Sequence, residues 1–528
     1  MQESRKSWLT LLGLWLVLLA LAALRPLSLP DEGRYGDIGR WMLVSGDWLA
    51  PRLDGIPFFH KPPLLHWLQA ITLGVAGVHA WSARLVPALH AGLMLVSLYL
   101  AARHIAGEAT ARRSVWMFGT SLAFLIGGQY INHDMLVAAW ISVAIWCFAA
   151  ALMQGDHSAK SMTKGLALAG FAACAMGVLG KGLIGLVLPG LVMFVWLSLT
   201  RQWPKALRLP WVSGLLLFSA LALPWFVLGQ HKYPGLFDYL IIGQHFGRYT
   251  GSTFNNQWPM WFYPLVLLGL LFPWAFLVLW QGVTGAFKQK LTLLKPESAW
   301  QALLWVWLLA IVVFFSLPRS KLVGYILPVM PPLTLLAAQV WQERLALKPK
   351  AAAMFALLCA ASLALGVTLN HLAAEHSLRQ SSRDVAHALA CRMGTDDTVI
   401  VAGGYPYDLP FEANLKHPIV VLDDWAQARQ SAGDNWHREM FEGADFDPQA
   451  AQVLQGRELL VQPHPANHWL VTSRDVSALG NLDRWQKVFE GRAWTLWQSA
   501  ASAGKRPETT EHKGLRCSDQ HRQEQRQQ

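Results

Sequence analysis

The stretch DEGRYGDIGRWMLVSGDWLAPRLDGIPFFHKPPLLHW, residues Asp31–Trp67, decides the fold, because it is a charged and proline-rich loop between two apolar segments. It holds five of the twelve acidic residues that precede position 370. Apolar residues recur at helical spacing from Tyr35 to Met42, which predicts an amphipathic helix on a membrane surface. The segment after it ends in HKPP, where the prolines stop a helix and hold Lys61 in an extended turn. The stretch therefore brings carboxylates and a lysine to one membrane face.

The chain on both sides of this stretch is apolar. Of its 528 residues, 53% are hydrophobic and 15% are charged, whereas about 25% of the residues in soluble domains are charged. The sequence predicts an all-α polytopic membrane domain whose first apolar segment, preceded by Arg5 and Lys6, is a retained anchor. Eleven apolar segments long enough to span a bilayer lie near residues 8–25, 84–102, 114–129, 134–153, 165–180, 183–200, 211–229, 260–280, 299–317, 322–341 and 351–369.

Charge is distributed unevenly along the chain. Residues 1–369 have a formal charge of +15, and residues 370–528 have −4. Alternate loops, together with the N-terminal segment, collect 16 basic against five acidic residues. This bias predicts that these loops are cytoplasmic and that Asp31–Trp67 faces outward. Positive-inside loops also explain the basic pI, so the sequence predicts membrane lipids and no nucleic acid as partners.

The pattern changes after Asn370. Short β-rich runs at 398–401, 419–422, 458–461, 468–472 and 494–497 alternate with polar stretches, which predicts a small α/β domain. We expect a transmembrane domain at 1–369 with an outward first loop at 26–83, an outward α/β domain at 370–502, and a polar disordered tail at 503–528. The five cysteines form no CxxC pair, so neither a disulfide framework nor a zinc site is predicted.

The outward loops carry the candidate site residues. Asp31 and Glu32 follow the first span directly and are placed to orient an attacking group or accept its proton, or simply to end the helix. Lys61 suits a phosphate, or it neutralises lipid headgroups as a snorkelling lysine. Asp134 begins a span immediately after an outer turn, and position alone favours a helix N-cap.

Further candidates lie in later outward segments. Basic residues on the outer side run against the positive-inside trend, which favours a functional role for them. Lys181, between two glycines, is a weaker candidate, because such a lysine can simply mark a tight turn. Histidines near the same face show no metal-site spacing, and the sequence leaves a divalent metal open. These additional candidates are Arg34, His60, Lys181, His245, Arg248, Arg319, Lys321 and Tyr325.

Nucleotide-binding motifs are absent from the sequence. It contains neither a GxGxxG loop after a strand nor GxxxxGK[ST], and no GxSxG elbow. The spans contain almost no ionisable side chains, although ion-coupled carriers usually bury some near the midplane. What remains is an outward pocket of carboxylates and cations at membrane level, suited to a phosphate attached to a lipid.

Six blocks, in order and spacing, resemble the bacterial GT-C glycosyltransferases of the protein mannosyltransferase and lipid A aminoarabinose transferase superfamily. The blocks are DEGRYGDIGRWM, PFFHKPPLLHW, NHDM, LGKGL, PWFVLGQ…PGLFDYLIIGQHFGRY and FFSLPRSKLVGYILPVMPPL. The resemblance covers about residues 8–345. It implies about 11 to 13 transmembrane helices with outer interfacial helices.

The resemblance also implies an activity: transfer of a sugar from undecaprenyl phosphate to an acceptor on the periplasmic face of the inner membrane, with lipid A as the leading acceptor. Asp31 and Asp134 are similar to the family's catalytic aspartates. Lys61, Arg248 and Tyr325 match positions that hold the donor phosphate. No nucleotide cofactor is implied. A protein or another envelope glycan as acceptor, a lipid or polysaccharide flippase, and a catalytically silent scaffold are the alternatives.

Two blocks depart from the family pattern. His60 stands where the aminoarabinose transferases usually have a glutamate, which puts a metal role of that position in doubt. The loop after Arg248 reads TGSTFNNQWP, where relatives often have a histidine. This difference leaves the sugar and the acceptor open.

Overall fold

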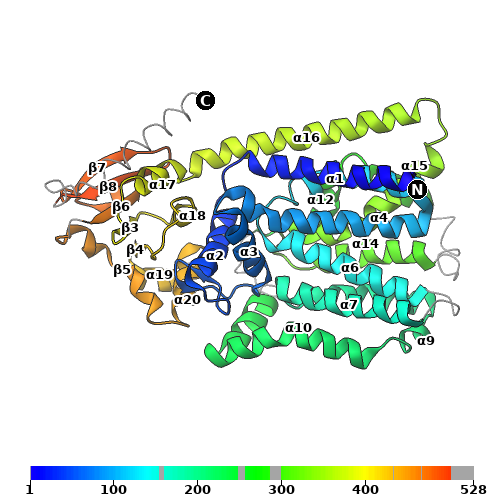
Figure 1. Cartoon of the computed structure of the whole chain (residues 1–528), viewed down its shortest axis with the longest axis horizontal. Helices are drawn as coiled ribbons and strands as arrows, with labels where there is room; N and C mark the ends of the chain where they lie inside the picture. The colour runs from blue at the N-terminus through cyan, green and yellow to red at the C-terminus, as the bar shows by residue number, and fades with distance from the viewer. Residues whose placement is uncertain are drawn as a thin grey trace. The chain divides into compact units, whose positions relative to one another are not determined.

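The computed structural model describes residues 2–153, 160–247, 256–285, 299–431, 433–464 and 467–500. The chain forms two compact units. The first comprises residues 1–24, 59–68 and 84–371, and the second comprises residues 25–58, 69–83 and 372–528. The first unit is helical, and the sheet of the second is drawn in orange and yellow in Figure 1.

Apolar helices build the first unit, several of them lying side by side in Figure 1. Its core is rich in fully buried aromatic side chains such as Trp196, Trp274, Trp307 and Trp341. The helices and the two shorter segments of irregular pitch are α1 (Gln2–Ala23), α4 (Ala80–Gly119), α5 (Leu122–Leu125), α6 (His133–Met153), α7 (Lys160–Lys181), α8 (Ile184–Thr200), α9 (Trp203–Ala206), α10 (Trp211–Lys232), η1 (Asp238–Gly247), α12 (Phe262–Leu270), α13 (Ala275–Gly285), α14 (Ala299–Ser316), η3 (Val323–Val329), α15 (Met330–Arg344) and α16 (Ala351–Gln380).

Eight helices in the described residues are long and apolar enough to cross a membrane, which makes the chain a multi-pass membrane protein. Eleven segments were expected, and three of them do not form a separate long helix. Residues 114–129 are divided between the end of α4 and the short α5, and α8 has only 17 residues. Residues 260–280 contain two short helices, α12 and α13, on either side of Pro273.

The second unit combines the first loop with the C-terminal domain. Its helices, strands and helical turns are α2 (Asp31–Ser45), β1 (Arg52–Leu53), β2 (Ile56–Pro57), α17 (Arg383–Ala390), β3 (Thr398–Ala402), α18 (Leu409–Glu412), β4 (Val420–Leu422), α19 (Trp425–Ser431), α20 (Trp436–Ala444), η4 (Ala450–Val453), β5 (Leu454–Gln455), η5 (Arg457–Val461), β6 (His468–Ser473), η6 (Ser477–Leu479), β7 (Trp485–Glu490) and β8 (Trp494–Ser499). Helix α3 (Leu64–Ala76), the start of α4 and the end of α16 also contribute residues to the second unit, so these three helices belong to both units.

A six-stranded sheet forms the centre of the C-terminal domain, with strand order β5-β4-β3-β6-β8-β7. The pairs β5–β4, β4–β3 and β3–β6 are parallel, and β8 pairs antiparallel with both β6 and β7. Four of the five residues of β3 are buried, as expected for a central strand covered on both faces. The expected α/β class is confirmed, but residues 458–461 lie in the 3₁₀ turn η5, and β5 and β7 were not predicted.

The first loop packs into this domain through a β-hairpin, formed by β1 and β2, whose turn has two residues. Asp54 and Gly55 connect β1 to β2 with φ values of 53° and 78°, as an Asp-Gly turn of type I′ requires. Asp54 Oδ1 accepts a hydrogen bond of 2.8 Å from the Ile419 amide. Gly443 of α20 lies so close to the Pro57 carbonyl that a Cβ would collide with it. The loop and the C-terminal domain therefore share one core.

Helix α2 differs from the expected surface helix, because its polar residues are covered. Ile38 belongs to the same buried cluster as Tyr405, Tyr407 and Val421. Asp37 and Arg40 are fully buried, and Arg40 Nε donates to Asp37 Oδ1 over 2.7 Å. Protein therefore covers the polar face of α2 as well as its apolar face.

The cysteines also differ from expectation, since Cys391 in the C-terminal domain is disulfide-bonded. Cys147, Cys174 and Cys359 are free. Spacing along the chain gave no signal of this bond, because a disulfide depends on proximity in the fold.

Candidate functional site

The first unit brings one group of predicted site residues together around the start of α6. Asp134 lies in the first turn of this helix, and Lys181 is the last residue of α7. The Lys181 ammonium forms an ion pair with Asp134 Oδ1, and both residues are buried, with exposures of 8% and 6%. A buried pair of this kind needs further partners, and Asn132 Nδ2 supplies one to Asp134 Oδ2 over 2.9 Å.

Tyr325 completes this group from η3. The Lys181 Nζ atom lies 4.2 Å from the centre of the Tyr325 ring, within the range of a cation–π contact. The Asp134 carboxylate packs directly on Gly324, where a Cβ would collide with it. Glycine at 324 is therefore required for the close approach of η3 to α6.

Lys61 lies in the same electrostatic environment. It stands between β2 and α3, is half-buried, and interacts electrostatically with His133, the neighbour of Asp134. His133 Nδ1 is 2.7 Å from the Gly180 carbonyl oxygen, and its ring meets that of His66 edge-on at 5.4 Å. His60, beside Lys61, contacts the Tyr239 ring at 5.9 Å. We call Lys61, Asp134, Lys181 and Tyr325 the cation cluster.

The second unit holds the other predicted carboxylates at the start of α2. Asp31 is 36% exposed and forms an ion pair with Arg34. Glu32 is fully buried and receives two guanidinium contacts from Arg25, one of them 3.1 Å long, and the Ser28 amide over 2.8 Å. Glu32 therefore fastens the chain where it leaves the first helix, whereas Asp31 stays accessible.

Arg34 is held by more than Asp31. Its guanidinium also forms an ion pair with Glu439 of α20 and lies over the rings of Tyr35 and Tyr407, at 5.1 and 5.5 Å. Burial lowers the pKa of Arg34, but the negative charge around it outweighs this effect and raises the pKa above its ordinary value. The group is a permanent cation.

Arg319 and Lys321 stand apart from the cation cluster in their contacts. Arg319 is exposed. Lys321 is buried, and its ammonium donates to the carbonyl oxygens of Trp258, over 2.8 Å, and of Pro318. This lysine ties two backbone segments together, which explains a basic residue there without a ligand.

Two further predictions fall at the limit of the described residues. Arg248 lies outside them, and only the backbone of His245, in η1, is described. Within the described residues, no three His, Cys, Asp or Glu side chains gather as a metal ion would need. Sequence reasoning missed Glu439 and Tyr407, because nothing in the sequence links the C-terminal domain to the first loop.

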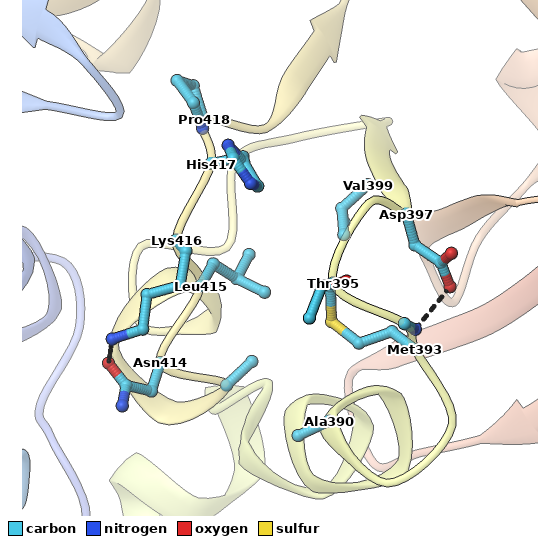
Figure 2. A pocket seen from close by; sticks show the side chains of 12 residues that line it. Ala390, Met393, Thr395, Asp397, Val399, Asn414, Leu415, Lys416, His417 and Pro418 are labelled. Atoms are coloured by element: carbon cyan, nitrogen blue, oxygen red, sulfur yellow. Dashed lines mark hydrogen bonds between the residues drawn. The ribbon is translucent and has the colours of Figure 1, made fainter. Parts of the chain in front are cut away.

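A separate cavity of about 180 Å³ lies in the C-terminal domain, between the loops at residues 393–397 and 413–418 (Figure 2). Asp397 Oδ2 accepts from the Gly394 amide over 2.8 Å and from Trp469 Nε1 over 2.7 Å. The cavity opens near the amino end of β3, whereas ligands of parallel sheets bind at the carboxyl ends. None of the predicted site residues lines it.

Comparison with known proteins links this geometry to a family. Residues 60–227 match the family model described as dolichyl-phosphate-mannose-protein mannosyltransferase. A curated relative from Pseudomonas fluorescens (strain Pf0-1) is named undecaprenyl phosphate-alpha-4-amino-4-deoxy-L-arabinose arabinosyl transferase 2. It is 32% identical over 360 residues, which cover 64% of this chain. The matched part spans only about 60% of that relative's length.

Solved structures share the fold over most of the chain. The crystal structure of ArnT from Cupriavidus metallidurans bound to undecaprenyl phosphate has a TM-score of 0.77 at 24% identity, covering 94% of this chain and 98% of that one. The archaeal oligosaccharyltransferase AglB from Archaeoglobus fulgidus has a TM-score of 0.52 at 14% identity, covering 95% and 75%. These comparisons agree with the resemblance expected from the sequence motifs: the chain has the fold of the ArnT crystal structure and is similar in sequence to arabinosyl transferases that use undecaprenyl phosphate.

Proposed function

We propose that the chain is a membrane glycosyltransferase that moves a sugar from undecaprenyl phosphate to lipid A. The observation that carries the proposal is the cation cluster: Lys181 pairs with Asp134 and contacts the Tyr325 ring, and Lys61 acts electrostatically on His133 beside Asp134. The chain that holds this cluster is 32% identical over 360 residues to a transferase of this donor class. The named relative supports the donor and an aminoarabinose sugar.

The chemistry assigned to these residues is a displacement at the anomeric carbon of the sugar. The bond from this carbon to the phosphate oxygen breaks, and undecaprenyl phosphate leaves with the electron pair. A new bond forms to an oxygen of the acceptor, and where that oxygen carries a proton, Asp31 accepts it. Asp31 suits this role because its carboxylate is accessible, in contrast to the buried Glu32.

The cation cluster suits the leaving group. Negative charge grows on the phosphate as the bond breaks, and fixed cations in a site with little water stabilise that charge strongly. Asp134 neutralises Lys181 and fixes its position under the Tyr325 ring. Lys61 supplies a second positive charge near this pair, and Arg248 is assigned to the same phosphate from its sequence motif.

We place the protein in the inner membrane with the active site and the C-terminal domain on the periplasmic side. The positive-inside bias of the loops supports this orientation.

Mass spectrometry of lipid A from a deletion strain tests the proposal. Wild-type protein restores the sugar-modified lipid A, whereas Asp31→Asn and Lys61→Ala reduce it by at least about 100-fold while the protein stays in the membrane. Lys164→Ala, an exposed lysine on α7, is the matched control and leaves modification unchanged. Unmodified lipid A with every version of the protein, together with a changed envelope glycan or protein, would assign a different acceptor.

A further inference from the structure

The charged groups around Arg34 form a chain that begins in the C-terminal domain and ends at Asp31. The Tyr407 hydroxyl donates a 2.7 Å hydrogen bond to Glu439 Oε2. Glu439 Oε1 pairs with Arg34 Nη1, and Arg34 Nη2 pairs with Asp31 Oδ1. All four residues belong to the second compact unit.

Arg34 could not hold Asp31 firmly by its place on α2 alone. An ion pair between helix residues three apart contributes little to stability when both side chains are in water. Here the Arg34 side chain is only 12% exposed, because Tyr35 and Tyr407 cover its guanidinium. Glu439, whose side chain is 13% exposed, binds Arg34 Nη1, the guanidinium nitrogen that does not contact Asp31.

The exposure of the side chains changes along this chain of contacts. Glu439 and Arg34 are nearly enclosed, whereas Asp31 is 36% exposed. A planar guanidinium held at both ends orients the carboxylates that it binds. The enclosed residues therefore set the orientation of the one carboxylate that a substrate can reach.

We propose that Glu439 is a positioning residue that orients the catalytic Asp31 through Arg34, and that this is one task of the C-terminal domain. The proposal rests on the proposed function, in which Asp31 contacts the acceptor. Glu439 itself touches neither the donor nor the acceptor.

Kinetics of full-length protein in lipid nanodiscs, with undecaprenyl phosphate-aminoarabinose as donor and lipid A as acceptor, test the proposal. We expect Glu439→Gln to lower kcat by roughly 10- to 100-fold with little change in the KM of the donor, since small misplacements of a reacting group have effects of this size. Glu442→Gln is the matched control. Glu442 lies one turn later on α20 and accepts a 2.5 Å hydrogen bond from Arg438 Nε, and its loss should leave kcat within about twofold.

A double-variant cycle separates positioning from a purely structural role. In an Arg34→Gln background, Glu439→Gln should lower kcat no further, because residues that act as a unit are not additive. The double variant removes both buried charges and should recover thermal stability without recovering kcat. Recovery of both together would show that Glu439 is structural and would overturn the proposal.

Hydrogen exchange of the peptide that contains residues 31–34 gives a readout independent of turnover. Glu439→Gln should raise its deuterium uptake, and Glu442→Gln should not. Unchanged uptake, or a kcat equal to that of the control variant in an active wild-type background, would overturn the positioning role alone. Absence of transfer by the wild-type protein would overturn the proposed function and, with it, the catalytic consequence of the contact.

Discussion

At the scale of single residues, two pairs of charged residues show that the surroundings of a side chain decide what it can do. Asp31 and Glu32 are adjacent in sequence, yet Glu32 is buried against Arg25 and Asp31 remains accessible beside Arg34. Asp134 and Lys181 are 47 residues apart and share one buried ion pair. The chemistry of a charged residue here depends on which partner encloses it.

Asp134→Asn tests the buried pair. The substitution leaves the Lys181 ammonium buried without its counterion, and we expect a loss of about 3–5 kcal/mol in the free energy of unfolding. Asp134→Asn with Lys181→Met should regain most of this loss, because replacing both charges removes the penalty. Thermal unfolding in detergent measures both variants.

Lys164→Met is the control. Lys164 lies on α7, as Lys181 does, but it is exposed, so its substitution should change the free energy of unfolding by less than about 0.5 kcal/mol. A double variant as unstable as Asp134→Asn would contradict the assignment. If Asp134 also acts in catalysis, the stabilised double variant remains inactive.

The sequence motifs identified most of these residues but not their partners. Asp134 alone looked like a helix cap, and Lys181 looked like a marker of a turn. The antiparallel contact of α6 and α7 brings the start of one helix to the end of the other. Two consecutive spans joined by a short loop make that contact predictable in general terms. The meeting of Arg34 with Glu439 was not predictable, because 405 residues separate them.

At the scale of elements, apolar periodicity predicted helices and central strands better than edge strands. The buried strands β3 and β6 were expected, because their side chains are apolar on both faces. Strand β7 was missed, since WQKVFE lies at the sheet edge with only Trp485 fully buried. Edge strands carry charged residues, which hides them from a search for apolar runs.

The β1–β2 hairpin contains a buried carboxyl that makes stability depend on pH. Burial raises the pKa of Asp54 well above its ordinary value of 3.8. Within the described chain, Asp54 Oδ2 has no hydrogen-bond partner. The folded chain therefore keeps a proton that the unfolded chain releases. Stability is greatest below the unfolded pKa of about 4 and falls as the pH rises toward the folded pKa.

Asp54→Asn should reduce this loss. Asparagine tolerates the positive φ of the turn and keeps an acceptor for the Ile419 amide. Melting temperatures measured from about pH 4 upward should decline less in the variant than in wild type, and the variant should be at least as stable at neutral pH. The exposed Asp483→Asn is the control. Parallel pH profiles of Asp54→Asn and wild type would show that Asp54 is ionised in the folded chain.

At the scale of the whole molecule, the sequence passes back and forth between the two compact units. The first loop, far from the C-terminal domain in sequence, belongs to the same compact unit. Sequence patterning divides a chain by composition, so it separates the apolar from the polar part at about residue 369. It cannot detect a polar loop that packs against a distant polar domain, because neither segment changes its own pattern when they meet.

The number of membrane crossings decides the side on which this C-terminal domain lies. In the part of the chain that the structure describes, eight helices meet the criteria of length and composition for a span. Helix α4, with 40 residues, is about 60 Å long, twice the thickness of a hydrocarbon core, and bends at Gly107, where φ is 80°. The 17 residues of α8 reach the lower limit of a span, and α12 and α13 together contain 20 residues. A second crossing by α4, one by α8 and one by the α12–α13 pair add three, and an odd total separates the two termini.

A pair of reporter fusions tests this parity. We expect alkaline phosphatase to be active when it is fused to the C-terminus, because the enzyme needs the oxidising periplasm to form its disulfides. A fusion after Arg208, in the basic segment between α8 and α10, should be inactive. Green fluorescent protein at the same two positions should give the opposite pattern. Activity at Arg208 and none at the C-terminus would mean either that the chain is inverted or that α4 or α8 supplies one crossing fewer, and both would contradict the periplasmic placement of the C-terminal domain. Inactivity at both would mean that the α12–α13 pair, the added crossing that lies between the two fusion sites, does not span the membrane, and this result would contradict the periplasmic placement of the C-terminal domain.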